Sequence, residues 1–347
     1  MTDYLSNKIR ILQALLILMV LYIHTYYTEA GANMQILQNI LGGGFCSVAV
    51  PLFYLISGYL FFLKIPEGIS SIWDKLKKRC RTLLFPYLIA NTLTFIFYIL
   101  LNALIWKVPS LGGVVNFKIF NVIADKKIGE VLRFIFIDPP IAFQLWFVRD
   151  LMVVMLFSPL IYFIFKCVIT KRLYVKITFG ILLLIFVFGH HVRFMPAAIW
   201  FTSGGLLSMA KINIDGRCNK TATLILSVLF ATMSVGTGIG FIGPEWKRYI
   251  PLVGIPAVWT LFDTIADKKQ INQKVAYFSK YTFFVYLCHE PLLNIFKKIP
   301  LLISHSEAIM IIAYLAVPIV FYVIACYLAS WLQKHAPKLY SIYTGGR

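Results

Sequence analysis

Apolar segments recur along the whole sequence, separated by short connections that carry most of its charged residues. Hydrophobic residues make up 60% of the 347 residues, which is more apolar surface than a soluble domain can bury. A helix that crosses the ~30 Å hydrocarbon core of a bilayer needs about 20 residues. The sequence therefore predicts an all-α polytopic membrane bundle, with residues 1–347 forming one domain. About ten transmembrane helices are expected, at 9–28, 45–63, 83–105, 144–166, 174–189, 196–210, 221–242, 249–266, 275–296 and 308–332.

Lysine and arginine are concentrated in alternate connections. Residues 28–44 contain neither, whereas the connection at 64–82 contains a dense basic stretch. Because short cytoplasmic loops are enriched in Lys and Arg, this asymmetry predicts that both termini are cytoplasmic. The same loops account for the formal net charge of +19, so the sequence favours membrane lipids over nucleic acid as partners.

His24 lies near the far end of the first apolar segment. Lys8 and Arg10 precede the apolar run Ile11–Ile23, and a rise of about 1.5 Å per residue places His24 roughly 20 Å beyond Arg10. An ionisable group at that depth is expected to face protein or a water-filled cavity, which makes His24 a candidate catalytic residue. The alternative is a neutral histidine that only bonds a neighbouring helix. The segment also fits a cleaved signal peptide, but the later spans require a cytoplasmic start.

Ionisable residues of two later segments are predicted at the depth of His24. Arg149 and Asp150 lie about two turns from the outer end of the fourth segment, and His289 and Glu290 lie in the outer half of the ninth. Their convergence favours an active site. The alternative is a structural network in which Arg149 pairs with Glu290. Asp150 points about 100° away from Arg149 around the helix, so a different partner is expected for it.

Smaller signals come from the second and third segments. Ser57 and Gly58 fit either close helix packing or a narrow passage for a long ligand. The basic stretch with Lys78, Arg79 and Arg81 fits lipid phosphates and topology, or a clamp for the phosphates of a ligand. The six cysteines show no metal-ligand spacing, so no metal site is predicted.

Five segments together resemble the acyltransferase-3 family of bacterial membrane acyltransferases. They keep the family's order over nearly the whole chain, and they read ILQALLILMVLYIH, VPLFYLISGYLFF, KKRCRTLLFPYL, LWFVRDL and FFVYLCHEPLL. The resemblance implies about ten helices in the bacterial plasma membrane, with both termini in the cytoplasm. It also implies transfer of an acyl group, usually acetyl, from cytoplasmic acyl-CoA to an acceptor outside the cell, often a surface glycan.

The resemblance also implies roles for single residues. His24 falls on the family's essential histidine, His289 on its ninth-span histidine motif, and Arg79 and Arg81 on its cytoplasmic arginines. One position departs from the family pattern, because Gln13 stands where members carry Arg or Lys ten intervening residues before the histidine. We expect Arg10, one turn earlier, to reach the same phosphate.

These assignments lead to a specific mechanism. The phosphates of acyl-CoA, expected to be acetyl-CoA, would bind at the cytoplasmic face, and the pantetheine arm would pass Ser57. His24 would accept a proton from the acceptor hydroxyl, or would carry the acyl group covalently. Glu290 would orient the imidazole, and Arg149 would stabilise the oxyanion. The predicted donor-binding residues are Arg79, Arg81, Lys78, Arg10 and Ser57, and the predicted catalytic residues are His24, Glu290, Arg149 and His289.

A transporter or flippase for a lipid-linked sugar or small solute is the alternative function. Buried charges would then form a substrate or proton path. The basic stretch before the third segment favours the enzyme, because a CoA site needs cations at the cytoplasmic face and a transporter does not. The absence of repeated halves in the sequence also weighs against transport.

Overall fold

The computed structural model describes residues 1–28, 31–63, 65, 69–108, 118–189, 192–216, 219–265 and 277–346. Within these ranges every regular element is helical, and no strand is present. The α-helices are α1 (Asp3–His24), α2 (Ala32–Gln38), α3 (Ala49–Phe62), α4 (Ser70–Arg79), α5 (Phe85–Lys107), α6 (Ile119–Ile123), α7 (Ile128–Phe136), α8 (Trp146–Leu156), α9 (Ser158–Val168), α10 (Arg172–Phe188), α11 (Met195–Met209), α12 (Lys220–Gly238), α13 (Pro244–Lys247), α14 (Ile250–Ile265), α16 (Thr282–Phe296), α17 (Glu307–His335) and α18 (Pro337–Thr344). Short π or 3-10 segments lie between some of them, at η1 (Asn39–Gly44), η2 (Phe45–Val48), η3 (Cys80–Leu84), η5 (Phe143–Leu145) and η6 (Pro300–Leu302).

Several helices begin at the residues that favour a helix start. The Thr2 side chain accepts a hydrogen bond from the backbone N–H of Leu5 and caps α1. Asn219 caps α12 in the same way, and Ser306 caps α17. Such caps satisfy backbone donors that have no partner within the first turn of a helix.

Membrane-spanning length is reached by five helical runs among the described residues. A sixth is added if α8 and α9, which meet at a bend of 58°, count as one span. The five runs are Asp3–His24, Ala32–Phe62, Ser70–Lys107, Lys220–Gly238 and Glu307–His335. The predicted all-helical architecture is therefore confirmed for the described residues, and several helices are long and apolar enough to cross a membrane, whereas the number of ten spans and the cytoplasmic termini remain predictions.

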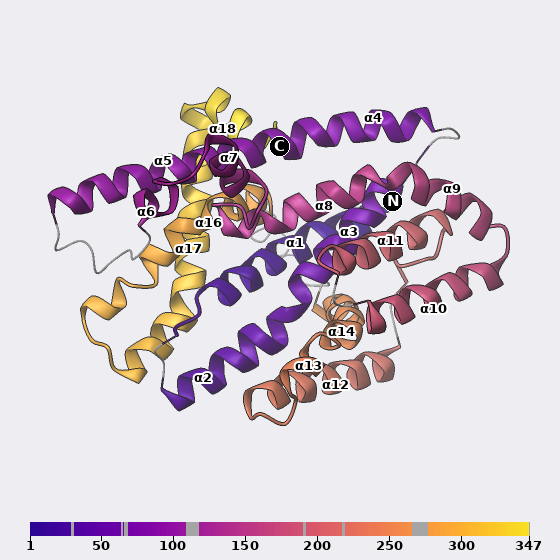
Figure 1. Cartoon of the computed structure of the whole chain (residues 1–347). Helices are drawn as coiled ribbons and strands as arrows, with labels where there is room; N and C mark the ends of the chain where they lie inside the picture. Colours follow the sequence, from indigo (N-terminus) through magenta and orange to yellow (C-terminus); the bar gives the residue numbers. More distant parts are fainter. Residues whose placement is uncertain are drawn as a thin grey trace.

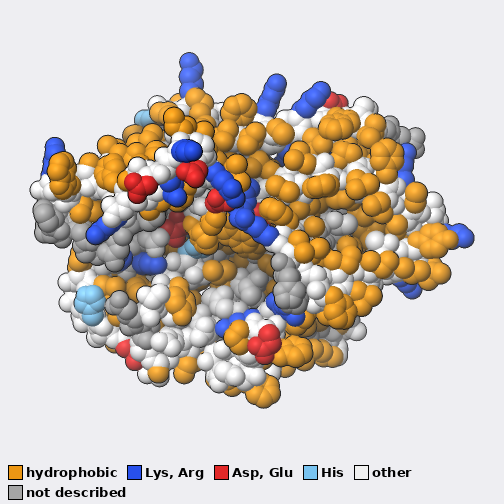
Figure 2. Space-filling model, viewed as in Figure 1, with side chains coloured by type: hydrophobic (Ala, Val, Ile, Leu, Met, Phe, Trp, Pro, Cys, Tyr) orange, Lys and Arg blue, Asp and Glu red, His pale blue; other side chains and the backbone are white. Residues whose placement is uncertain are grey.

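The long helices surround α1 and α3. In Figure 1, α4 and α5 lie end to end along one edge, and α10 and α12 lie on the other side of α1 and α3. α1 packs against α3, α16 and α17. Hydrophobic side chains cover much of the face seen in Figure 2. Over the described surface as a whole, large hydrophobic side chains such as Leu100, Leu184 and Ile312 are more than half exposed. Such a surface suits contact with lipid rather than water.

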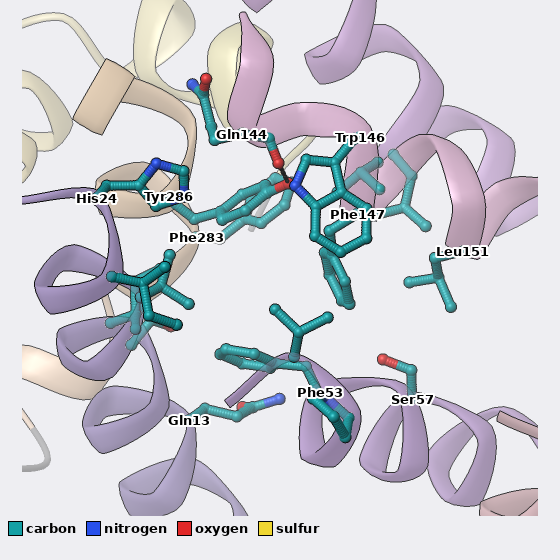
Figure 3. Close-up of a pocket in the computed structure, with 18 of the residues that line it drawn as sticks. Gln13, His24, Phe53, Ser57, Gln144, Trp146, Phe147, Leu151, Phe283 and Tyr286 are labelled. Atoms are coloured by element: carbon teal, nitrogen blue, oxygen red, sulfur yellow. Dashed lines mark hydrogen bonds between the residues drawn. The ribbon is translucent and has the colours of Figure 1, made fainter. Parts of the chain in front are cut away.

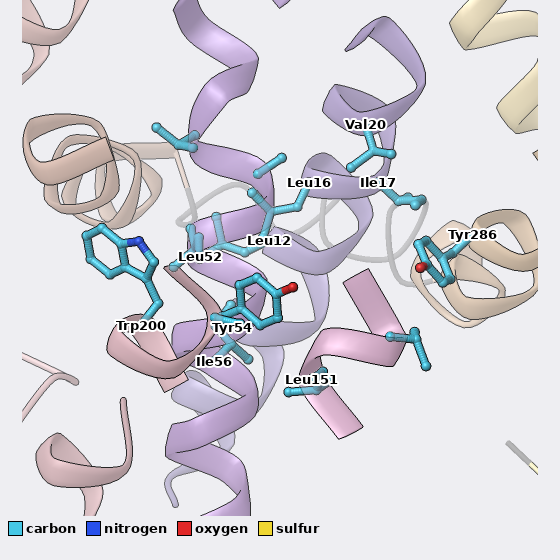
Figure 4. Packing of buried hydrophobic residues seen from close by; sticks show 14 of the residues in the cluster. Leu12, Leu16, Ile17, Val20, Leu52, Tyr54, Ile56, Leu151, Trp200 and Tyr286 are labelled. Atoms are coloured by element: carbon cyan, nitrogen blue, oxygen red, sulfur yellow. The ribbon is translucent and has the colours of Figure 1, made fainter. Parts of the chain in front are cut away.

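The interior between α1 and α3 is filled by branched and aromatic side chains. Leu12 and Leu16 of α1 are buried with Leu52 and Tyr54 of α3, as Figure 4 shows. On its other side α3 packs closely against α11. A Cβ atom added to Gly58 would lie 1.9 Å from the Phe201 carbonyl oxygen. The close-packing interpretation of Gly58 is therefore confirmed, because only glycine allows the two backbones to approach so closely.

Candidate active site

A cavity of about 750 Å³ lies between α1, α3, α8 and α16. Most of the side chains that line it are apolar or aromatic, as in many pockets for organic ligands. Gln13 and His24 both line the cavity from α1 and are eleven residues apart, which corresponds to roughly 16 Å along the helix. Figure 3 shows Gln13 and Ser57 on the side of the cavity opposite His24. The cavity therefore extends along much of α1.

His24, the last residue of α1, faces Glu290 of α16. The Nδ1 atom of His24 lies 3.5 Å from Oε1 of Glu290, and the side chains are 16% and 10% exposed. This distance is longer than a normal hydrogen bond but is an ion-pair distance. The His24 ring is also 5.0 Å from the His289 ring, centroid to centroid. The structure thus brings His24 of the first helix together with the adjacent residues His289 and Glu290, which come much later in the sequence.

One carboxylate oxygen of Glu290 faces His24, and the other accepts a hydrogen bond. Asn294, one helical turn further along, donates a hydrogen bond from Nδ2 to Oε2 of Glu290. Lys297, just after α16, donates from Nζ to the backbone oxygens of His24 and Tyr26, at 3.4 Å and 3.2 Å. Burial lowers the pKa of Lys297, and the Glu290 carboxylate opposes that shift. These contacts fix the end of α16 against the end of α1.

The helix α16 is broken at Glu290, which has non-helical φ and ψ of −105° and 132°. The next residue, Pro291, has no backbone N–H, so the Leu287 carbonyl lacks its usual partner four residues later. The side chain of Gln144 fills this gap. Its Nε2 atom donates to the carbonyl oxygens of Leu287 and Glu290, at 3.2 Å each.

His289 is completely buried beside this break. Its Nδ1 atom lies 2.8 Å from the Tyr286 carbonyl oxygen. Because a carbonyl only accepts, Nδ1 carries the proton in this contact. The other ring nitrogen, Nε2, is buried and has no hydrogen-bond partner among the described residues. His289 therefore presents an unpaired acceptor close to His24.

Arg149 does not join this group. Its Nε and Nη2 atoms donate to Oδ1 of Asp150 at 2.9 Å and 2.7 Å, and its Nη1 atom donates to the Ile137 carbonyl oxygen at 2.8 Å. The alternative in which Arg149 pairs with Glu290 is therefore not found among the described residues, and Asp150 bonds Arg149 rather than the different partner expected for it. Two N–H groups of the guanidinium thus bond one and the same carboxylate oxygen of Asp150.

Comparison of the sequence with known proteins identifies its family. Residues 6–337 match the acyltransferase domain of the acyltransferase-3 family. The chain belongs to this family.

The acyltransferase is also similar to the succinoglycan biosynthesis protein ExoH of Rhizobium meliloti (strain 1021). The two are 23% identical over 366 residues, which cover 99% of this chain and 92% of the relative. No solved structure matches the chain. The family and this relative show that the membrane protein is an enzyme that transfers acyl groups.

Two cations of the acyltransferase line the cavity among the described residues, Arg79 and Lys280. Arg79 was predicted from the sequence, whereas Lys280 was not singled out. The signal that identifies Lys280 is a cation near the start of the ninth apolar segment. Lys78 and Arg81 are exposed and do not line the cavity in the described structure.

Gln13 and Ser57 line the cavity of the acyltransferase, whereas Arg10 does not. Arg10 is exposed and donates from Nη2 to Oδ1 of Asn7 at 2.9 Å. The expectation that Arg10 takes the place of the missing cation has no support in this geometry. Ser57 and Gly58 face in different directions, because successive helical residues are about 100° apart.

Lys8 is buried, although the sequence predicts it to lie on the cytoplasmic side of the first apolar segment. It is 1% exposed, and its Nζ atom lies 2.7 Å from Oδ1 of Asp263 on α14. The Tyr4 hydroxyl donates to the same oxygen, and Nζ lies 4.3 Å from the Trp259 ring centroid. The signal for this pair is the acidic Asp263 inside the eighth apolar segment. The pair connects the start of α1 to α14.

Proposed function

We propose that this acyltransferase is an O-acyltransferase that moves an acetyl group from cytoplasmic acetyl-CoA to a hydroxyl of a cell-surface or exopolysaccharide glycan. It does so as a multi-pass protein of the bacterial plasma membrane. The observation that carries the proposal is that one cavity is lined both by His24, beside Glu290, and by the cations Arg79 and Lys280. A thioester fits the part of the cavity next to His24, and the phosphates of its carrier fit the part next to Arg79 and Lys280.

The donor end is supported by charge and position. Among the described residues, no carboxylate lies within ion-pair distance of Arg79 or Lys280. Lys280 lies in the turn before α16 begins at Thr282, and the eight helical steps from Thr282 to Glu290 correspond to about 12 Å. In our proposal the two cations bind CoA phosphates, and the pantetheine arm passes Gln13 and Ser57 toward His24.

The catalytic end is supported by the contact between His24 and Glu290. A carboxylate next to Nδ1 favours the tautomer with the proton on that nitrogen, which leaves Nε2 as a proton acceptor. Nε2 takes the proton of the acceptor hydroxyl, and the hydroxyl oxygen attacks the thioester carbonyl at the same time. The carbon–sulfur bond then breaks, and His24 returns the proton to the CoA thiolate. The products are an O-acyl ester and CoA.

The acceptor class is supported by the similar protein from Rhizobium meliloti, whose name refers to the biosynthesis of a glycan, succinoglycan. The similarity covers nearly the whole chain, so it includes the residues around His24. A glycan also offers the hydroxyl groups that the proposed base requires.

The proposal is tested on the surface glycan of cells that lack the gene. We expect their glycan to lose an alkali-labile O-acetyl signal in NMR linkage analysis, and we expect the wild-type gene to restore it. His24→Gln and His24→Ala should both fail to restore it, because positioned acid–base groups typically contribute about 10²–10⁴-fold to rate. Glutamine keeps hydrogen bonding but cannot accept the proton.

Expression and melting temperature of the detergent-purified variants serve as controls. An unchanged glycan in the deletion strain would refute the proposed acceptor class. Restoration by His24→Gln would show that His24 is structural and would remove the catalytic assignment.

A further inference from the structure

Gln144 occupies an unusual place between two parts of the site. It lies in η5, lines the cavity, and is 2% exposed. Its side chain donates to both carbonyls at the break of α16, and its own backbone oxygen accepts from the Tyr286 hydroxyl at 2.8 Å. Figure 3 shows Gln144 and His24 on the same side of the cavity, with the Gln144 amide directed away from the cavity centre. Gln144 therefore bonds the helix that carries Glu290 at three points.

We propose that Gln144 is a positioning residue that holds the broken turn of α16 so that Glu290 faces His24. The inference rests on the proposed catalytic role of His24. Pro291 leaves the Leu287 carbonyl without its helical donor, so without Gln144 this carbonyl would have to find another donor in an apolar interior, and an unsatisfied buried carbonyl is costly. The turn would then rearrange, and Glu290 is the residue at its centre.

The donor half of the amide explains its place here, whereas its Oε1 atom is buried without a hydrogen-bond partner among the described residues. Nε2 supplies two hydrogens, one for each carbonyl, and an uncharged group requires no counterion in the interior. The leucine or methionine that would fit an apolar segment supplies no donor. Asparagine is one methylene shorter and would not reach the same two oxygens without movement of η5.

The test is a double-mutant cycle on purified enzyme, with acetyl-CoA as donor and release of CoA measured in the presence of the acceptor glycan. Gln144→Met keeps the volume of the side chain but removes the donors. We expect kcat to fall on the order of 10²-fold, as for misplaced catalytic groups, with the KM for acetyl-CoA changed less than about twofold. We expect Glu290→Gln to lower kcat to a similar degree.

The double variant separates positioning from simple stability. If Gln144 acts through Glu290, Gln144→Met adds no further loss to Glu290→Gln. Multiplied losses would overturn the proposal, as would a Gln144→Met enzyme with a lower melting temperature but normal kcat. Gln333→Met is the matched control. The Gln333 side chain also makes a hydrogen bond, since its Oε1 atom accepts from the Tyr281 hydroxyl at 3.2 Å near the C-terminal end of α17. This variant should leave kcat unchanged.

A second variant covers the case in which Gln144→Met does not fold. Pro291→Ala returns a backbone N–H to the break and allows α16 to continue as a regular helix, which turns Glu290 away from its present position. We expect this variant to fold and to lose kcat, and full activity would overturn the proposal. Wild-type enzyme without acyl transfer would instead refute the proposed function itself, so the two failures are distinct.

Discussion

Arg79 and Lys280 reach the cavity from two segments that are distant in the sequence. Arg79 is the last residue of α4, and Lys280 lies just before α16. A guanidinium presents a planar fork to phosphate oxygens, whereas an ammonium acts as a point charge. The two side chains are therefore suited to different phosphates of one ligand, or to two sides of the same phosphate.

We predict that Arg79→Ala and Lys280→Ala each raise the KM for acetyl-CoA by about 10-fold to 100-fold. A hydrogen bond to a charged group contributes roughly 1.5–3 kcal/mol, which is the source of this range. Arg79→Lys should recover only part of the loss. Steady-state kinetics on purified enzyme measure the effect, with Lys77→Ala, an exposed lysine of α4, as the control. Unchanged KM values for both variants would contradict the donor site.

Three ionisable residues of the site were predictable from the sequence. His24, His289 and Glu290 were singled out because charge inside a membrane span is rare, and the structure places them together. Gln144 is a neutral amide, so neither periodicity nor charge distinguished it. Its importance appears only from its contacts with a helix that lies more than 140 residues later.

At the level of helices, the crossing of α3 and α11 depends on two glycines. A Cβ atom on Gly204 would lie 1.9 Å from the Leu55 carbonyl oxygen, which mirrors the contact of Gly58 with Phe201. Each helix thus presents a glycine to the backbone of the other helix. For Ser57 and Gly58 the sequence allows either close helix packing or a ligand passage. The two adjacent residues divide the roles, since Gly58 faces α11 and Ser57 lines the cavity.

We predict that Gly58→Ala destabilises the folded protein by about 1–3 kcal/mol, the usual cost of forcing extra atoms into a packed interior. The added Cβ would press on backbone, which cannot rotate away as a side chain does. Gly180→Ala in α10 is the matched control, because no atom lies within 4 Å of its Cβ position and alanine favours a helix. Thermal unfolding in detergent compares the two. Equal melting temperatures would contradict the packing argument.

Some helix boundaries differ from the sequence prediction. The span predicted at 45–63 continues a longer helical run that begins at Ala32 and passes through π and 3-10 turns. The span predicted at 144–166 is the bent pair α8 and α9. Hydropathy windows report only the apolar content of a segment. They carry no information on bends or on irregular turns that tertiary contacts stabilise.

For the molecule as a whole, orientation in the membrane remains a prediction from loop charge. The 28–44 connection lacks Lys and Arg, whereas α4 ends in Lys77, Lys78 and Arg79. If short basic loops are cytoplasmic, the cations of the donor site face the compartment that contains acyl-CoA. His24 then lies toward the outside, where a surface glycan is available.

We predict that a cysteine at Asn33 reacts with an impermeant thiol reagent added to intact cells, and that one at Ser71 does not. All six native cysteines are first replaced, because Cys80 and Cys167 are exposed. Asn33 is itself exposed, so its accessibility does not depend on local opening. Permeabilised cells provide the control in which Ser71→Cys becomes reactive. The reverse labelling pattern would place the donor site outside and refute the proposed direction of transfer.

The spacing of Gln13 and His24 on α1 limits the insertions and deletions that this helix can accept. Eleven helical residues correspond to within about 20° of three full turns, so both side chains face the same cavity. One inserted residue between them would rotate His24 by about 100° relative to Gln13 and away from Glu290. A deletion of a whole turn would retain the direction but shorten the separation by about 5 Å. We therefore expect an insertion or deletion between Gln13 and His24 to disrupt the cavity, even at positions where one apolar residue can replace another.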